Sequence, residues 1–268
     1  MQSSWRPSPF LTASVGLHLS AIAAVVLAPA WWLPVLSLLA VDHLIITVAG
    51  LDPRSRLLGL NVSRLPPAAS PRVALTFDDG PDPNVTPAVL DLLDSVGARA
   101  SFFCVARRVE RHPHLAREIH ARGHRVENHS LCHRHNFAFL GPTRLTREIS
   151  QAQDSIEKVV GRRPILFRAP AGVRSVWLDA VLSRLRLRLV SWTRRGFDTV
   201  SRDPRQVVRR LTRGLGDGDI LLLHDGSAAY DEKRTPVVLS ALPPLLQALA
   251  ERGLPSVPVD EALEGTNP

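Results

Sequence analysis

The sequence has few cysteines, few lysines and no phosphate-binding loop. With only Cys104 and Cys132 among 268 residues, a disulfide framework is excluded, so the fold must depend on a hydrophobic core. Lys158 and Lys233 are the only lysines among 33 basic residues. The usual nucleotide-binding folds have no support, because neither a Walker-A loop nor a glycine-rich dinucleotide motif follows an expected strand.

The chain is basic, with a formal net charge of +8 that comes almost entirely from arginine. A basic chain attracts anionic partners in general, including a phospholipid surface. The arginine excess is also what a genomic composition bias produces, so it does not indicate nucleic-acid binding. We therefore predict no nucleic-acid partner. The hydrophobic content of 45% excludes a disordered chain.

Two long apolar runs lie near the N-terminus. The first extends from Phe10 to Pro29, with His18 as its sole ionisable residue, and the second from Val35 to Leu51. Both are close to the roughly 20 residues that a helix needs to cross a bilayer. The segment between them contains Trp31 and Trp32, which suit a turn at the membrane interface. The sequence therefore predicts a two-helix membrane hairpin within residues 1–51, with helices at about 10–29 and 35–51.

A cleaved signal peptide is the alternative for the first run, because Ala28-Pro29-Ala30 resembles a cleavage site. Cleavage there would leave a second apolar segment at the new N-terminus, so we favour the hairpin. His18 and Asp42 lie twelve residues on either side of Ala30, at similar depth in a hairpin. Because a lone charge in lipid is costly, we predict that they pair. The alternative is a shallow second helix that does not fully span.

Arginines flank the hairpin and are absent from its turn. Arg6 precedes the first run, and Arg54, Arg56 and Arg64 follow the second. The positive-inside rule then predicts a multi-pass protein of the cell (inner) membrane whose remaining residues lie on the cytoplasmic side. Two unpaired thiols agree with a reducing compartment.

After a predicted linker at residues 52–71, short apolar runs alternate with helical patterns. The expected strands lie at 73–77, 100–105, 124–128, 164–168, 187–192, 219–224 and 255–259. Helices are expected from Thr86, from Thr143 to Gly161, from Pro204, and from Pro236 with an interruption at Pro243-Pro244. Seven strands interleaved with helices predict an α/β fold, a barrel-like parallel sheet with its site at the carboxyl ends of the strands.

Carboxylates and imidazoles follow two of these strands. Asp78 and Asp79 end the first; alone, such a pair is typical of a capped turn, but adjacent carboxylates repel unless a cation or a proton lies between them. His129 and His133 follow the third strand and would share one face of a helical turn, with Cys132 packing elsewhere. Two imidazoles and the Asp79 carboxylate are a ligand set typical of catalytic metal sites.

Two further motifs end strands in the same way, at Phe167–Gly172 and at Leu221–Gly226. Together, TFDDGP, HSLCH, RAPAG and LLLHD, in that order, resemble the signature of the polysaccharide deacetylases, which are carbohydrate esterase family 4 with its NodB-homology domain. The resemblance covers residues 72–262 and leaves a tail at 263–268. It implies a distorted (β/α) barrel of about seven parallel strands.

The resemblance also implies a role for each motif residue. Asp78 would be the general base, and Arg168 would hold its carboxylate. Asp79, His129 and His133 would bind a divalent metal ion, with zinc the expected one, and a water activated by that ion would be the nucleophile.

His224 would be the general acid, oriented by Asp198. The backbone N–H of Ala171 would stabilise the oxyanion, Leu222 would line the pocket for the acyl methyl group, and Trp192 would contact the substrate.

The sequence thus predicts a metal-dependent carbohydrate deacetylase, a hydrolase of non-peptide amide bonds. Its substrate would carry an N-acetyl or other N-acyl group on an amino sugar, in a glycan or a lipid-linked saccharide, and its other partner would be membrane lipid. An O-acetyl carbohydrate esterase, a metal phosphoesterase and a catalytically silent envelope scaffold of the same fold are the alternatives. Arg194 and Arg195 belong to an arginine-rich stretch that is expected to form a solvated outer face. Because they precede Asp198, the sharper hypothesis is that they face an anionic substrate, such as a lipid-linked phosphate sugar.

Overall fold

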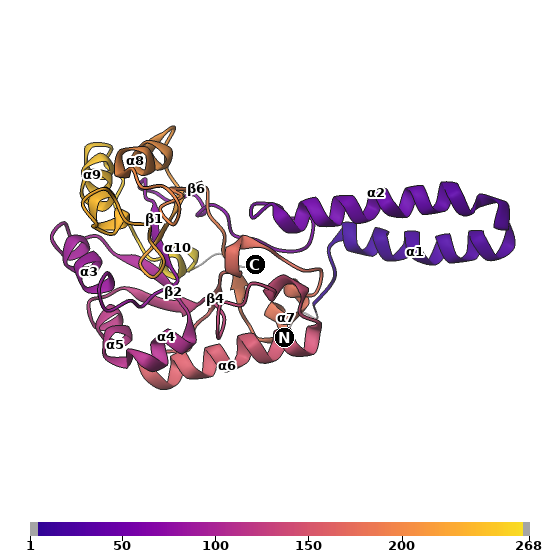
Figure 1. Ribbon diagram of the computed structural model, residues 1–268, viewed down its shortest axis with the longest axis horizontal. Helices are drawn as coiled ribbons and strands as arrows, with labels where there is room; N and C mark the ends of the chain where they lie inside the picture. Colours follow the sequence, from indigo (N-terminus) through magenta and orange to yellow (C-terminus); the bar gives the residue numbers. More distant parts are fainter. Residues whose placement is uncertain (1–4, 265–268) are drawn as a thin grey trace.

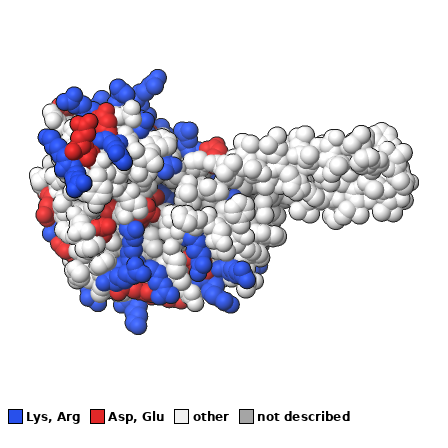
Figure 2. Space-filling view, viewed as in Figure 1, with Lys and Arg blue, Asp and Glu red and all other residues white. Residues whose placement is uncertain are grey.

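The computed structural model describes residues 5–264, in which a half-barrel domain carries an apolar helical hairpin that projects from one side (Figure 1). The hairpin consists of α1 (Pro9–Leu27) and α2 (Trp32–Leu51), joined by the short 3-10 turn η1 (Pro29–Trp31). Both helices are mostly exposed, and Figure 2 shows almost no charged side chain along them. The two predicted apolar helices are confirmed, and helices of this kind serve as a membrane anchor or a signal peptide.

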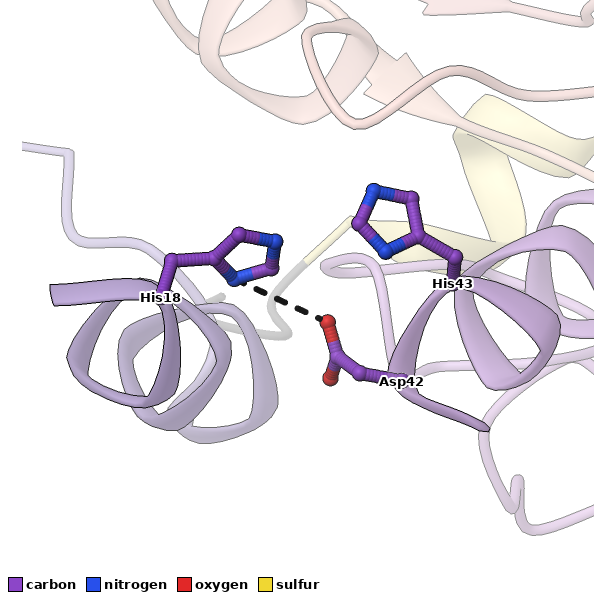
Figure 3. A group of neighbouring side chains, drawn as sticks. All are labelled: His18, Asp42 and His43. Carbon is purple, nitrogen blue, oxygen red and sulfur yellow. Dashed lines mark ion pairs between the residues drawn. The ribbon is translucent and has the colours of Figure 1, made fainter. Parts of the chain in front are cut away.

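Polar side chains meet between the two helices halfway along the hairpin (Figure 3). Asp42 accepts a hydrogen bond from Ser14 Oγ at 2.7 Å, and its Oδ2 lies 3.9 Å from His18 Nδ1. The His43 ring lies 5.2 Å from the His18 ring, and the Nδ1 of each donates to the carbonyl four residues earlier. The structure therefore brings His18 and Asp42 together as predicted, with Ser14 and His43 beside them.

The sheet contains seven strands, and every pairing between them is parallel. Their order is β5-β4-β3-β2-β1-β7-β6, so β1 lies near the centre, between β2 and β7. The sheet curls into a half-barrel, which confirms the predicted fold class. The strands are β1 (Ala74–Asp78), β2 (Ala100–Cys104), β3 (Arg125–Asn128), β4 (Leu166–Phe167), β5 (Arg188–Leu189), β6 (Arg194–Arg195) and β7 (Ile220–His224).

Helices cover the outer face of the sheet (Figure 1). Those of the domain are α3 (Thr86–Asp94), α4 (Ala106–Arg111), α5 (Pro113–Ala121), α6 (Pro142–Val160), α7 (Leu178–Arg184), α8 (Pro204–Thr212), α9 (Val237–Glu251) and α10 (Val259–Leu263). One helix begins and another ends at the residue that the sequence predicts. Asp203 accepts a hydrogen bond from Arg205 N at 2.9 Å and caps α8, and Gly161 ends α6 with a left-handed φ of 78°.

The central strands are mostly apolar because both faces of the sheet are covered. Successive residues alternate between two clusters: Leu75 and Phe77 pack with the outer helices, whereas Ala74 packs inside the half-barrel with Phe103 and Leu222. Every residue of β1, β2 and β7 is buried. Continuous apolar runs are typical of such strands.

Two of the expected elements are wrong. The predicted strand at 255–259 forms only one bridge, between Val73 and Ser256, because Pro255 and Pro258 have no N–H for a ladder; the seventh strand is instead β6. The predicted interruption at Pro243-Pro244 does not occur, since α9 continues through both residues. Its buried face, which includes Leu242, Leu245 and Leu249, holds the helix against the sheet.

The segment after α2 lies along the open side of the half-barrel. Val62 pairs with the chain beyond β5, where Val62 N donates to Leu189 O at 2.9 Å and Ser191 N donates to Val62 O at 2.8 Å. Three residues later, Leu65 N donates to Gly218 O at 2.8 Å, just before β7. Residues 62–65 therefore connect the two sides of the sheet, and the predicted division at 52–71 stays a prediction.

Arg174 joins the hairpin to the domain. Its Nη2 donates to the carbonyls of Ala49, Asp52 and Ser55 at 3.0, 3.2 and 2.9 Å, and its backbone N–H donates to Gly50 O at 3.0 Å. These carbonyls lie at the carboxyl end of α2, which carries unpaired acceptors and partial negative charge. A guanidinium from the domain thus caps the second helix of the hairpin.

Candidate active site

Asp78 is fixed by a buried arginine at the carboxyl end of β1. Arg168 Nη1 donates to Asp78 Oδ1 at 2.7 Å and to Thr76 Oγ1 at 2.8 Å. Its other nitrogens donate to the carbonyls of Val190 and Ser191 at 3.3 and 3.0 Å, and its guanidinium carbon lies 4.1 Å from the centre of the Phe103 ring. Asp78 and Arg168 are both buried, so the structure brings them together as predicted.

Asp79 turns away from Asp78 toward the two predicted histidines. Its φ of 72° is left-handed, so adjacent carboxylates point to different partners. Asp79 Oδ1 lies 3.4 Å from His129 Nε2 and 3.3 Å from His133 Nε2. The three residues form a compact group of potential metal ligands, in which only His133 is partly exposed.

The histidines reach Asp79 from a loop, and the predicted helical turn at 129–133 is wrong. Ser130 and His133 have left-handed φ values of 70° and 49°, which no α-helix contains. Side chains stabilise the loop: Asn128 Oδ1 accepts from Ser130 N at 2.8 Å, and Ser130 Oγ accepts from His133 N at 3.0 Å. Such local bonds compete with helix formation.

The geometry of this group fits a divalent metal ion. Ligands held at about 2.1 Å from a tetrahedral ion lie about 3.4 Å from one another, close to the observed separations. His129 Nδ1 lies 2.8 Å from Arg168 O, and because a carbonyl only accepts, Nδ1 carries the hydrogen. When this imidazole is neutral, its lone pair is therefore on Nε2, which faces Asp79, as in metal sites whose ligands are oriented by outer hydrogen bonds.

The charges of the site also favour a bound cation. Burial opposes ionisation of Asp79, but the hydrogen bond and charge of His129 outweigh it and hold the pKa of Asp79 well below its usual value. Burial likewise opposes protonation of His129, yet Asp78 and Asp79 raise its pKa. Burial and the charge of His129 lower the pKa of His133. An ionised carboxylate beside a neutral imidazole is what a metal ion requires.

His224 ends β7 beside Asp78 and is oriented by Asp198. Its Nδ1 lies 2.9 Å from Asp198 Oδ1, and its backbone N–H donates to Asp198 Oδ2 at 2.7 Å. Burial would lower the pKa of His224, but the hydrogen bond and charge of Asp198 outweigh it and raise that pKa. Because β1 and β7 pair with Asp78 opposite His224, the acid and the base expected from the sequence occupy neighbouring strands.

The three residues predicted to contact the substrate differ in burial. Ala171 lies in the short turn η3 (Pro170–Gly172) after Arg168, exposed and with a left-handed φ of 56°. Leu222 and Trp192 are buried in the cluster inside the half-barrel. The next residue after Ala171 must be glycine, because a Cβ on Gly172 would lie 2.5 Å from the Trp192 ring. The roles of all three stay predictions.

Arg194 does not face the site, so its predicted role is wrong. Its guanidinium binds the carboxylate of Asp219 and the carbonyls of Arg213 and Gly214. Asp219 is completely buried and needs this counter-charge. Arg195 instead lies 4.8 Å from the centre of the Phe197 ring, next to Asp198.

Sequence reasoning missed two groups that support the site. Asp225 is completely buried, and burial raises its pKa to about 7; Thr86 Oγ1 donates to it at 2.6 Å. It packs under the acidic turn so closely that a Cβ on Gly80 would lie 2.2 Å from its Oδ2. Asn61 accepts from Ser191 Oγ at 2.9 Å, beside a carbonyl that Arg168 uses. The sequence could have indicated Asp225 through its position next to His224, whereas no local motif indicates Asn61.

Comparison with known proteins gives one consistent result. A sequence profile described as "Polysaccharide deacetylase" matches residues 66–190. The peptidoglycan-N-acetylglucosamine deacetylase of Bacillus cereus is 35% identical over 193 residues, which cover 71% of this chain and 87% of that protein. The chitooligosaccharide deacetylase of Azorhizobium caulinodans is 32% identical over 194 residues, which cover 70% of this chain and 92% of that protein.

A solved structure agrees with the sequence relatives. The family 4 carbohydrate esterase from Streptomyces lividans, in complex with acetate, is 34% identical and superposes with a TM-score of 0.63. The alignment covers 70% of this chain and 93% of that one. The similarity therefore extends over nearly the whole of these proteins and not over the hairpin.

We expect one divalent ion to bind per chain, and His133→Ala to remove that binding. Losing a direct ligand should weaken zinc affinity beyond the roughly 10–100-fold that changes around a metal site typically cost. Isothermal titration of the purified protein with zinc measures this. His135→Ala, in the same loop but outside the ligand group, is the control. Equal affinity in the two variants would contradict the assignment.

We expect Asp198→Asn to lower the pKa of His224. The carboxylate raises that pKa, so its loss should let the imidazole deprotonate at lower pH. The amide oxygen can still accept one of the two hydrogen bonds that Asp198 accepts from His224. NMR titration of the His224 Cε1 proton gives the midpoint, with Asp154→Asn on α6 as a control. An unchanged midpoint in Asp198→Asn would exclude this electrostatic coupling.

Proposed function

The chain belongs to the polysaccharide deacetylase family, carbohydrate esterase family 4, and on that basis we propose that it is a metal-dependent N-deacetylase of amino sugars. The named activities of its relatives support carbohydrate N-deacetylation. One observation carries the finer proposal: Asp79, His129 and His133 converge, with Asp78 on one side and the His224–Asp198 pair on the neighbouring strand.

Asp79, His129 and His133 would hold the metal ion, which when bound supplies a Lewis acid that polarises the acyl carbonyl and activates water. Asp78 acts as the base. Arg168 occupies its Oδ1, which leaves Oδ2, 3.9 Å from His129 Nε2, to accept the proton of the attacking water. The same ion pair fixes the Asp78 carboxylate in one orientation.

His224 acts as the acid. Asp198 accepts from Nδ1, so the opposite nitrogen, Nε2, can donate a proton to the departing amine. An amine is a poor leaving group without that proton, whereas the alkoxide of an O-acetyl ester needs it less. The His224–Asp198 pair thus favours N-deacetylation over the O-acetyl alternative. The backbone N–H of Ala171 would stabilise the oxyanion, a contribution of about 3 kcal/mol for one such donor.

The substrate we propose is an N-acetylated amino sugar in a saccharide linked to lipid. Relatives that act on peptidoglycan and chitooligosaccharides support the sugar class. The lipid linkage is supported by the hairpin, because α1 and α2 are exposed, apolar and long enough to anchor the domain at a bilayer. Arg194 offers no support for an anionic substrate.

We further propose that the hairpin stays attached and that the domain lies on the cytoplasmic side. Cleavage before Ala30 would remove α1 from the side of α2. Asp42 would then lose the hydrogen bond from Ser14 and become exposed. The arginines at both hairpin ends, Arg6 and Arg54 among them, support the cytoplasmic side.

We expect Asp78→Asn and His224→Ala to retain metal and lose most turnover, by roughly 10²–10⁴-fold each, because each removes one proton-transfer group. Acetate release from polymeric and polyprenyl-linked N-acetyl amino sugars measures this, with a chelator-treated sample for metal dependence. Asp154→Asn serves as the control. Full turnover by either variant would remove its assigned role, and inactivity of the natural chain on every substrate would favour the silent scaffold.

We expect a reporter fused after residue 30, in the hairpin turn, to be outside the cytoplasm and one fused after Leu51 to be inside. Alkaline phosphatase is active only outside and green fluorescent protein is bright inside, so the two reporters give opposite patterns at the two sites. Phosphatase activity after Leu51 would place the domain outside.

A further inference from the structure

A pocket of about 590 Å³ lies where the hairpin meets the domain. Three parts of the chain form its walls: residues just before α1, residues just after α2, and the stretch from α7 to β5. Leucines make up most of the apolar wall, and apart from Asn61, which bonds Ser191 beside Arg168, the lining residues do not belong to the candidate active site. Those that matter below are Trp5, Arg6, Arg56, Asp179, Arg186 and Arg188.

The pocket has a strong excess of positive charge. Four arginines line it against one acid, Asp179. Both oxygens of Asp179 are already used, since Oδ2 accepts from Trp5 Nε1 at 2.7 Å and Oδ1 accepts from Leu60 N at 3.1 Å. Within residues 5–264, none of the four guanidinium groups has a hydrogen bond or an ion pair. A guanidinium presents two parallel N–H donors, a geometry that matches phosphate.

The backbone at Arg186 supports a role for its side chain. Arg186 has a left-handed φ of 56° in the turn between α7 and β5, a conformation that glycine adopts without strain. This conformation ends α7, where Leu187 N donates to Leu182 O at 2.9 Å, and glycine is the residue most often found at such a position. The exposed Arg186 side chain has no hydrogen bond or ion pair within the described residues. Residues held in strained conformations cluster at binding sites.

The pocket lies at the level where a bilayer would present phosphate groups. Arg6 precedes the start of α1 at Pro9 by three residues, and Arg56 follows the end of α2 at Leu51 by five. At about 3.4 Å a residue, these arginines can lie no more than roughly 10 and 17 Å from the helix ends. Both helix ends face the domain in Figure 1, and the lipid headgroup layer begins where spanning helices end. Trp5, which is 39% exposed, suits that interface.

We propose that this pocket binds the phosphate of an anionic phospholipid from the bilayer around the hairpin. Arg56, after α2, and Arg186, between α7 and β5, line the pocket and hold the phosphate, while the exposed lining residue Leu60 contacts the first carbons of the acyl chains. The inference rests on the proposed membrane hairpin. The lipid would be a structural ligand that is not consumed, separate from the saccharide.

The test uses the full chain in neutral detergent, titrated with short-chain phosphatidylglycerol, short-chain phosphatidylcholine or inorganic phosphate. Native mass spectrometry counts bound molecules, and the shift in Tm reports affinity. Phosphatidylglycerol should bind one to one and raise Tm. The paired substitution Arg56→Gln and Arg186→Gln should weaken this binding at least tenfold, because it removes two charge-assisted contacts. The control, Arg111→Gln with Arg202→Gln, removes two exposed, unpaired arginines elsewhere and should bind normally.

Two further measurements keep the outcomes distinct. Arg186→Gly should raise Tm without lipid, because glycine relieves the left-handed strain, and yet weaken phosphatidylglycerol binding. Equal binding of phosphatidylcholine, equal binding by both paired variants, or binding of phosphate as tight as that of the lipid would each overturn the proposal. Extraction of the natural chain from membranes by alkaline carbonate would contradict the hairpin, and a lack of acetate release by the natural chain, with lipid binding intact, would contradict the proposed reaction alone.

Discussion

The buried ion pair between Arg168 and Asp78 is the interaction on which the site depends. Arg168 is the largest side chain that the fold buries completely, and taking its charge out of water is costly unless its N–H groups find acceptors. They find them on β1 and on the chain beyond β5, so the arginine crosses the interior of the half-barrel and ties its two sides together. The base, the centre of the sheet and the open side are therefore stabilised by one group. A lysine, with a single point charge, could not reach all of these acceptors.

The second constraint is that two adjacent carboxyl groups, those of Asp78 and Asp79, share a buried place and would repel each other if both pointed the same way. The backbone solves this at Asp79, whose left-handed φ sends its side chain to the histidines while Asp78 faces the arginine. Each carboxyl group then has its own partners: the Arg168 guanidinium for Asp78, and the imidazoles of His129 and His133 for Asp79. Asp225 packs against the turn, and because burial raises its pKa to about 7, it carries less negative charge there at neutral pH than an ordinary aspartate does. In the proposed reaction, proton removal and metal binding would belong to separate residues.

The sequence predicted those features of the structure that the local choice of residues decides. Apolar runs located six strands, because strands buried on both faces leave no alternation. The metal ligands, Arg168, and the His224–Asp198 pair came together as the family resemblance implies. The failures have a common origin in tertiary contacts. Side-chain bonds from Asn128 and Ser130 hold the histidine loop out of a helix, burial carries α9 across Pro243 and Pro244, and β6 exists because Arg194 lies against β7 and Asp219. No local pattern encodes the distant partner that decides each case.

Arg174 caps α2, and residues 62–65 pair along the half-barrel. The connection between the hairpin and the domain is therefore not a long flexible linker. An active site on a long flexible linker would reach substrates at many different distances from the membrane. With the hairpin in a bilayer, as proposed, the mouth of the site would be held at one height and one tilt above the membrane plane. Encounters then occur in two dimensions, and the rate of turnover would follow how many target molecules occupy each unit of membrane area, while saccharides free in solution would be reached only as they drift past that fixed level.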